Sequence, residues 1–132
     1  MITVHRTQVM PAWVEQLSSI HRVTVLKHAG VLAGLEAALR EVVVPALTFA
    51  SLMQLAPSQM IDLLHIDAEG HDAAILDQID LDGSPPGAIL FESRHLSAGD
   101  RQRCERRLMA SGYRLHNHYR DTLAIRSDGL TH

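Results

Sequence analysis

The fold is decided by the ten residues Ile61-Asp62-Leu63-Leu64-His65-Ile66-Asp67-Ala68-Glu69-Gly70. A short apolar run ends there in a carboxylate and a turn, and a second run, Gly87 to Phe91, ends in Glu92. Between the two runs, Ile75 and Ile79 stand one helical turn apart. Continuous apolar strands joined by a helix are typical of parallel strands buried on both faces. We therefore expect a βαβ unit in which residues 61–66 and 88–91 form neighbouring parallel strands.

The pattern continues on the C-terminal side. Ser97 followed by Asp100 resembles a capping box, and the helix it opens ends at Gly112. Residues 113–118 and 122–126 then alternate apolar and polar side chains, which predicts an antiparallel hairpin. The fold class is thus α/β, with helices on the faces of the sheet and a hairpin at the C-terminal end.

The N-terminal side is less regular. Helical spacing of apolar residues predicts two helices in residues 1–41. The β-branched run Val42 to Leu47 contains Pro45, so we expect a strand at a sheet edge, where a missing N–H is tolerated. Thr48 should then cap a short helix from Phe49 to Leu55.

Composition excludes several classes of protein. A chain of 132 residues with 46% hydrophobic side chains has the size of a single domain with one core. A net charge of -3 leaves no broad cationic surface, so we expect no nucleic-acid partner. The sequence has one cysteine, Cys104, and no apolar stretch long enough to cross a membrane. These features predict a cytoplasmic protein with no membrane partner.

Several segments together resemble one known family. They are residues 44–52, the run Ile61 to Asp72, Ile75-Leu76, Ile89 to Glu92, Gly112-Tyr113 and residues 121–124. The order of these segments and the Asp67-Ala68-Glu69-Gly70 core closely resemble the FkbM family of methyltransferases, over roughly residues 18–126. The resemblance implies part of a class I methyltransferase sheet, which is Rossmann-like, with S-adenosylmethionine as cofactor. It also implies methyl transfer to the hydroxyl of a small-molecule acceptor.

The resemblance covers only part of that domain. In this fold a glycine-rich turn and a second-strand acid hold the cofactor, and the eight glycines of the chain form no G-x-G-x-x-G pattern. We therefore read residues 42–132 as the C-terminal half of a methyltransferase-like domain in a truncated or partial form, preceded by the N-terminal helices of residues 1–41. No cofactor-binding residue can be assigned, and binding of S-adenosylmethionine by the chain alone is doubtful.

Four residues form the candidate catalytic site: Asp67, Glu69, Glu92 and His95. Asp67 and Glu92 end the two predicted parallel strands, at the edge where open α/β sheets bind ligands. Asp67 is the best candidate to orient or deprotonate an acceptor hydroxyl. Two roles stay open for Glu69, this one and the stabilisation of a helix N-terminus, whereas Asp72 is interpreted as a helix cap. We predict no metal site.

Two other functions remain open. A sheet that lacks inner strands exposes an edge, so the chain could be a non-catalytic binding or oligomerising module, and we expect a homo-oligomer. A small metal-dependent hydrolase using the same four residues is a third possibility, which only their proximity favours.

Overall fold

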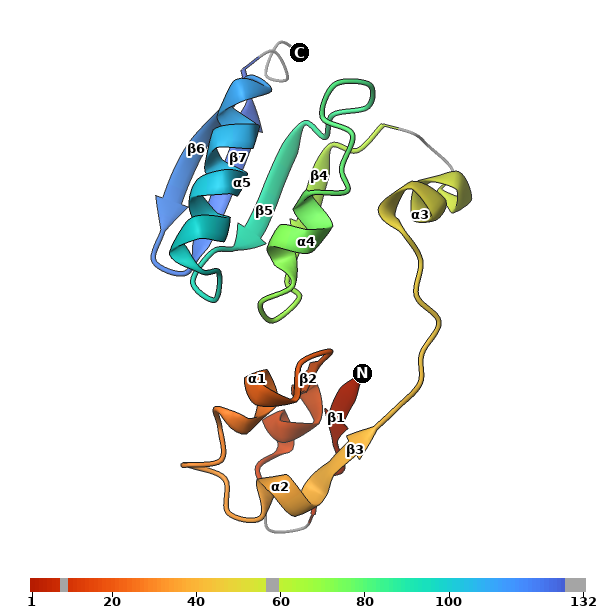
Figure 1. The fold of residues 1–132 in the computed structure, drawn as a ribbon, viewed down its shortest axis with the longest axis vertical. Helices are drawn as coiled ribbons and strands as arrows, with labels where there is room; N and C mark the ends of the chain where they lie inside the picture. Colours follow the sequence, from red (N-terminus) through yellow and green to blue (C-terminus); the bar gives the residue numbers. More distant parts are fainter. Residues whose placement is uncertain (8–9, 57–59, 128–132) are drawn as a thin grey trace. The chain divides into compact units, whose positions relative to one another are not determined.

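The computed structural model describes residues 1–7, 10–56 and 60–127. The chain forms two compact units, Met1–Ala46 and Leu47–His132, and each is described by itself. Figure 1 shows the elements of both units. Within the described residues, none of the helices has the length and apolar character needed to cross a bilayer.

The first unit is a small mixed structure. Its strands β1 (Ile2–Val4), β2 (Ser18–Ser19) and β3 (Leu39–Glu41) form an antiparallel sheet in the order β2-β1-β3. Its helices are the 3-10 helix η1 (Ala12–Gln16), α1 (Arg22–Leu26) and α2 (Leu35–Ala38). The prediction of two helices in residues 1–41 is therefore wrong in detail. Gly34, with φ of 76°, starts α2 in the left-handed region and prevents one long helix from running through this segment.

The segment that joins the units is not the edge strand that its β-branched residues predicted. The strand ends at Glu41, and residues 42–48 have no regular structure. Val43 is 98% exposed, so the run covers no apolar surface in the described structure. Pro45 has no N–H to donate to a ladder, and the valines before it are only partly buried, with Val42 38% and Val44 44% exposed, so burial offsets little of that loss.

The second unit carries the predicted βαβ unit. Its elements are α3 (Phe49–Leu55), β4 (Leu63–Ile66), α4 (Asp72–Leu76), β5 (Ala88–Glu92), α5 (Ala98–Ala110), β6 (Tyr113–His118) and β7 (Asp121–Arg126). The sheet order is β4-β5-β7-β6. The pairing of β4 with β5 is parallel and that of β6 with β7 is antiparallel, as the sequence predicted. The predicted caps are also present, because Thr48 and Ser97 accept hydrogen bonds from the N–H groups of Ser51 and Asp100.

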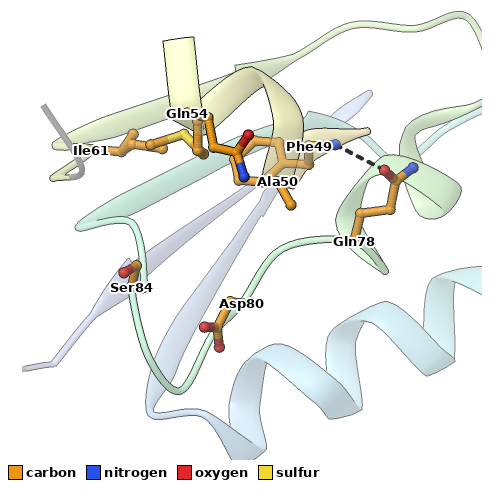
Figure 2. Close-up of a pocket in the computed structure, with 8 residues that line it drawn as sticks. Phe49, Ala50, Gln54, Ile61, Gln78, Asp80 and Ser84 are labelled. Carbon is orange, nitrogen blue, oxygen red and sulfur yellow. Dashed lines mark hydrogen bonds between the residues drawn. The ribbon is translucent and has the colours of Figure 1, made fainter. Parts of the chain in front are cut away.

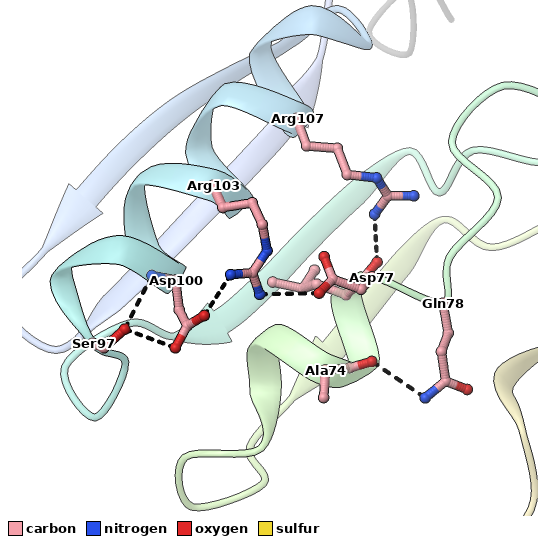
Figure 3. A network of polar contacts seen from close by, with 8 residues as sticks. Ala74, Asp77, Gln78, Ser97, Asp100, Arg103 and Arg107 are labelled. Carbon is pink, nitrogen blue, oxygen red and sulfur yellow. Dashed lines mark hydrogen bonds and ion pairs between the residues drawn. The ribbon is translucent and has the colours of Figure 1, made fainter.

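Helices α4 and α5 lie together on one face of this sheet (Figure 1). The core between them is apolar, and its most buried members are Leu76, Ile79, Ile89, Phe91, Leu108 and Ala124. Two arginines of α5 also hold the helices together (Figure 3). Arg103 forms an ion pair with Asp77 at 3.0 Å, and Arg107 donates to the carbonyl groups of Leu76 and Ile79. The face of α5 that carries these arginines therefore packs against α4 and is not simply solvated.

Strand β4 is the outer strand of the described sheet. It pairs with β5 on one side, and Leu63 is 57% exposed. Gly87 fixes the register of β4 at the start of the strand, because an added Cβ at Gly87 would lie 2.9 Å from the Asp62 carbonyl oxygen. The close approach of these two backbones aligns the carboxyl ends of β4 and β5.

Candidate functional site

The site lies where β4 and β5 end. Ile66 pairs with Phe91, so Asp67 and Glu92 follow neighbouring positions in the two parallel strands. The sheet thus places the two strand-end carboxylates on one rim, where open α/β sheets commonly bind ligands.

The turn after β4 has an unusual backbone. Glu69 has φ of 48° and Gly70 has φ of 95°, so two consecutive residues occupy the left-handed region. Glycine adopts this region freely, whereas a glutamate there is uncommon and costs free energy. This turn brings the Glu69 side chain from the β4–α4 connection to the end of β5.

Asp72 fixes the start of α4 to the end of β5. It is fully buried, and its carboxylate accepts hydrogen bonds from the N–H groups of Gly70 and Glu92, each at 3.3 Å. Burial raises the pKa of Asp72, and the backbone N–H groups oppose that rise. The sequence indicated only a helix cap here. In the structure, Asp72 also bridges the two elements that carry Glu69 and Glu92.

Glu92 is largely buried, with 12% of its side chain exposed. Its Oε1 lies 3.6 Å from His95 Nε2 and 3.4 Å from a guanidinium nitrogen of Arg120. Burial raises the pKa of Glu92, and the charges of Glu69 and Asp67 act in the same direction. The charges of His95 and Arg120 oppose this effect.

Three of the four predicted catalytic residues meet in one cluster. Glu69, Glu92 and His95 each offer a ligand atom, and these atoms all lie within 4.8 Å of one another. We call these three residues the rim cluster. Asp67 is exposed and lies outside the cluster, but it is near enough for its charge to affect Glu92.

Sequence reasoning missed Arg120. Its guanidinium faces Glu92, and its carbonyl oxygen accepts hydrogen bonds from the N–H groups of Ser93 and Arg94 at 2.9 and 3.0 Å. The β6–β7 turn therefore holds the loop that carries His95. No sequence signal identifies this contact, because it depends on β7 pairing with β5, where Asp121 is opposite Glu92.

A separate hollow lies at the other end of β4. Figure 2 shows it between α3 and the loop after α4, with Phe49, Gln54, Ile61, Gln78, Asp80 and Ser84 among the lining residues. Gln78 Oε1 accepts a hydrogen bond from the Phe49 N–H at 3.0 Å, which attaches α3 to this loop. Ile61 precedes β4, so the hollow is remote from the rim cluster at the carboxyl end of the strand.

Comparison with known proteins identifies the class. Residues 14–128 match the methyltransferase FkbM domain family, which is most of the chain, so the chain belongs to that family. Neither the curated proteins nor the solved structures include a match to this chain. The family resemblance that the sequence indicated is thereby confirmed.

The family generally uses S-adenosylmethionine. Helix N-termini are natural sites for a carboxylate or hydroxyl ligand. Here, however, the N–H of Gly70 binds Asp72 and the N–H of Asp100 binds Ser97. These two amide groups are thus satisfied internally, and the rim cluster offers two carboxylates and an imidazole at the ends of β4 and β5.

Proposed function

We propose that the second unit binds a hydroxyl-bearing small molecule at the rim and prepares its oxygen for methylation. It would thus form the acceptor side of an S-adenosylmethionine-dependent O-methyltransferase. The observation that carries this proposal is the convergence of Glu69, Glu92 and His95 at the ends of β4 and β5. Positioning of a hydroxyl is the main demand that methyl transfer makes on its acceptor site.

Each rim residue has a role in the proposal. The carboxylates of Glu69 and Glu92 line the place where the acceptor binds, and His95 orients Glu92 from 3.6 Å away. Asp67 takes the hydroxyl proton, because its exposed carboxylate is free to exchange that proton with solvent. Burial of Glu92 keeps the hydrogen bonds to the acceptor in a medium of lower dielectric than water.

The methyl donor, S-adenosylmethionine, needs a binding site of its own. When bound, S-adenosylmethionine supplies the methyl group as an electrophile. We propose that polypeptide other than the described residues holds it. Two or three missing hydrogen bonds, at about 1–3 kcal/mol each, would reduce its affinity for this chain by orders of magnitude.

The single cysteine supports a reducing compartment such as the cytoplasm.

Nuclear magnetic resonance tests the acceptor site. A panel of small polyols, sugars and phenols is added to the ¹⁵N-labelled chain, and we expect shifts in the amide signals of Gly70, Glu92 and His95. Glu92→Gln should abolish these shifts, whereas Asp62→Asn, which changes an exposed carboxylate before β4, should keep them. The acceptor site would be refuted if Glu92→Gln left the shift changes unaltered, or if the shifted amide signals belonged to residues of the hollow beside α3.

Calorimetry tests the donor part. We expect a dissociation constant of about millimolar or weaker for S-adenosylhomocysteine and the purified chain, because the hydrogen bonds that would hold the ligand are missing. Micromolar binding would show that the chain does build a donor site.

A second candidate function is supported by β4 itself. It is the outer strand of the described sheet, and Leu63 is 57% exposed on it. We propose that this edge pairs with a second copy of the chain, since exposed edges and apolar side chains favour association. Light scattering should then give a dimer that Leu63→Lys dissociates. Met109→Lys, which changes an exposed methionine of α5, should leave the dimer intact. A clean monomer at high micromolar concentration would refute this function.

A further inference from the structure

The rim cluster contains the donor atoms of a metal site. Its two carboxylates and one imidazole come from three separate places: the β4–α4 turn, the end of β5 and the following loop. Ligands about 2.1 Å from one ion lie roughly 3 to 4.2 Å from one another. The separation of 3.6 Å between His95 Nε2 and Glu92 Oε1 falls within that range, and the other pairs, all within 4.8 Å, reach it after at most a small side-chain movement.

The polar contacts of Glu92 give an independent reason to expect a cation. This carboxylate is largely buried, yet its nearest described cationic nitrogens are 3.4 and 3.6 Å away. Charge-assisted hydrogen bonds of this kind are normally about 2.7–2.9 Å long. Glu69 brings a second negative charge to the same place. A divalent ion between them would satisfy both carboxylates at once, which neither Arg120 nor His95 does at these distances.

We propose that Glu69, Glu92 and His95 bind one divalent transition-metal ion of the Mn²⁺ or Zn²⁺ class. Carboxylate oxygens are the ligands that Mn²⁺ prefers, and the imidazole nitrogen favours a transition ion over Mg²⁺ or Ca²⁺. Three protein ligands leave coordination positions open, as catalytic sites require. Arg120 competes with the ion for Glu92 and must move away when the ion binds.

The ion explains how a carboxylate can act as base in this site, and this part of the inference rests on the proposed function. An alcohol is far too weak an acid to lose its proton to an ordinary carboxylate. Coordination to a dication lowers the pKa of a bound hydroxyl strongly. Glu69, Glu92 and His95 would hold the ion, and Asp67 would accept the proton of the bound hydroxyl while the O–H electron pair stays on the oxygen.

Electron paramagnetic resonance tests the site without any acceptor or methyl donor. The full chain is stripped with a chelator and titrated with Mn²⁺, whose free signal disappears on binding. We expect one ion per chain. Glu92→Gln and His95→Gln should each weaken binding by at least about tenfold. Arg120→Ala should strengthen binding several-fold, because it removes a competing cation.

The control variant is Asp82→Asn, which changes an exposed carboxylate in the turn after α4 and should bind Mn²⁺ as the wild type does. Circular dichroism verifies that each variant is folded. Absence of Mn²⁺ binding, or binding that Glu92→Gln and His95→Gln leave unchanged, would overturn the proposal. If Mn²⁺ binds as expected but no hydroxyl compound perturbs the rim amides, the metal site stands and the acceptor function fails.

Discussion

The bridge formed by Asp72 gives the sharpest prediction for stability. Asp72→Ala deprives the N–H groups of Gly70 and Glu92 of their acceptor in a buried place. Each unsatisfied group costs about 1–3 kcal/mol, and removal of a buried charge returns part of that cost. We expect a net loss of about 2 kcal/mol, a substantial fraction of the roughly 5–15 kcal/mol that stabilises a domain.

Urea unfolding followed by far-UV circular dichroism measures this loss. Asp62→Ala serves as the matched control, because it removes an exposed carboxylate of the same sheet and should change the free energy of unfolding by less than about 0.5 kcal/mol. Asp72→Asn keeps one acceptor oxygen and should fall between the two. An Asp72→Ala variant as stable as Asp62→Ala would refute the bridge.

The pH dependence provides a second readout of the same group. Burial raises the pKa of Asp72 above its ordinary value of 3.8, so the native state holds the proton more tightly than the unfolded state. The resulting stabilisation is fully present below pH 3.8 and is lost as the pH rises through the folded-state pKa. The wild type should therefore lose stability relative to Asp72→Asn as the pH rises from 3.8 through the folded-state pKa of Asp72. A constant difference across this interval would contradict the burial of a carboxylate with a raised pKa.

Three further substitutions test the frame of the second unit. Ser97→Ala removes the cap of α5 and should cost about 1 kcal/mol in urea unfolding; an unchanged midpoint would show that the cap is not formed. Arg107→Met removes a donor from the carbonyl groups of Leu76 and Ile79, so amide hydrogen exchange should accelerate in α4 and not in β6; unchanged rates in α4 would disprove the contact. Gly87→Ala would place a Cβ 2.9 Å from the Asp62 carbonyl oxygen, so we expect a loss of about 1–3 kcal/mol in thermal unfolding, and a neutral effect would argue against this register.

The second unit could be predicted from the sequence because its signals are local and agree with one another. The apolar runs before Asp67 and Glu92 specify buried strands, and the helix between them requires a parallel crossover. Ser97 and Thr48 mark helix starts whose caps the structure contains. Such signals need no knowledge of distant contacts.

The first unit could not be predicted in the same way. Strands β1, β2 and β3 have only two or three residues each, which is too short for any periodicity to be visible. Apolar residues do not mark a buried helix face in this unit, since Val31 is 77% exposed while its neighbour Leu32 is buried. The candidate site likewise combines residues that local signals predict with residues that they do not. The strand ends placed Glu92, but the partners Arg120 and Asp72 depend on tertiary pairing that no local pattern encodes.

Arg120 contributes to the rim in two chemically separate ways. Its peptide oxygen secures the loop that carries His95, and its guanidinium supplies charge beside Glu92. Every amino acid has the peptide oxygen, so only the charge is subject to substitution. The electrostatics of the rim can therefore be retuned, by evolution or by an engineer, at one codon and without loosening the loop. Position 120 is therefore the place to alter the charge beside Glu92 while keeping the scaffold.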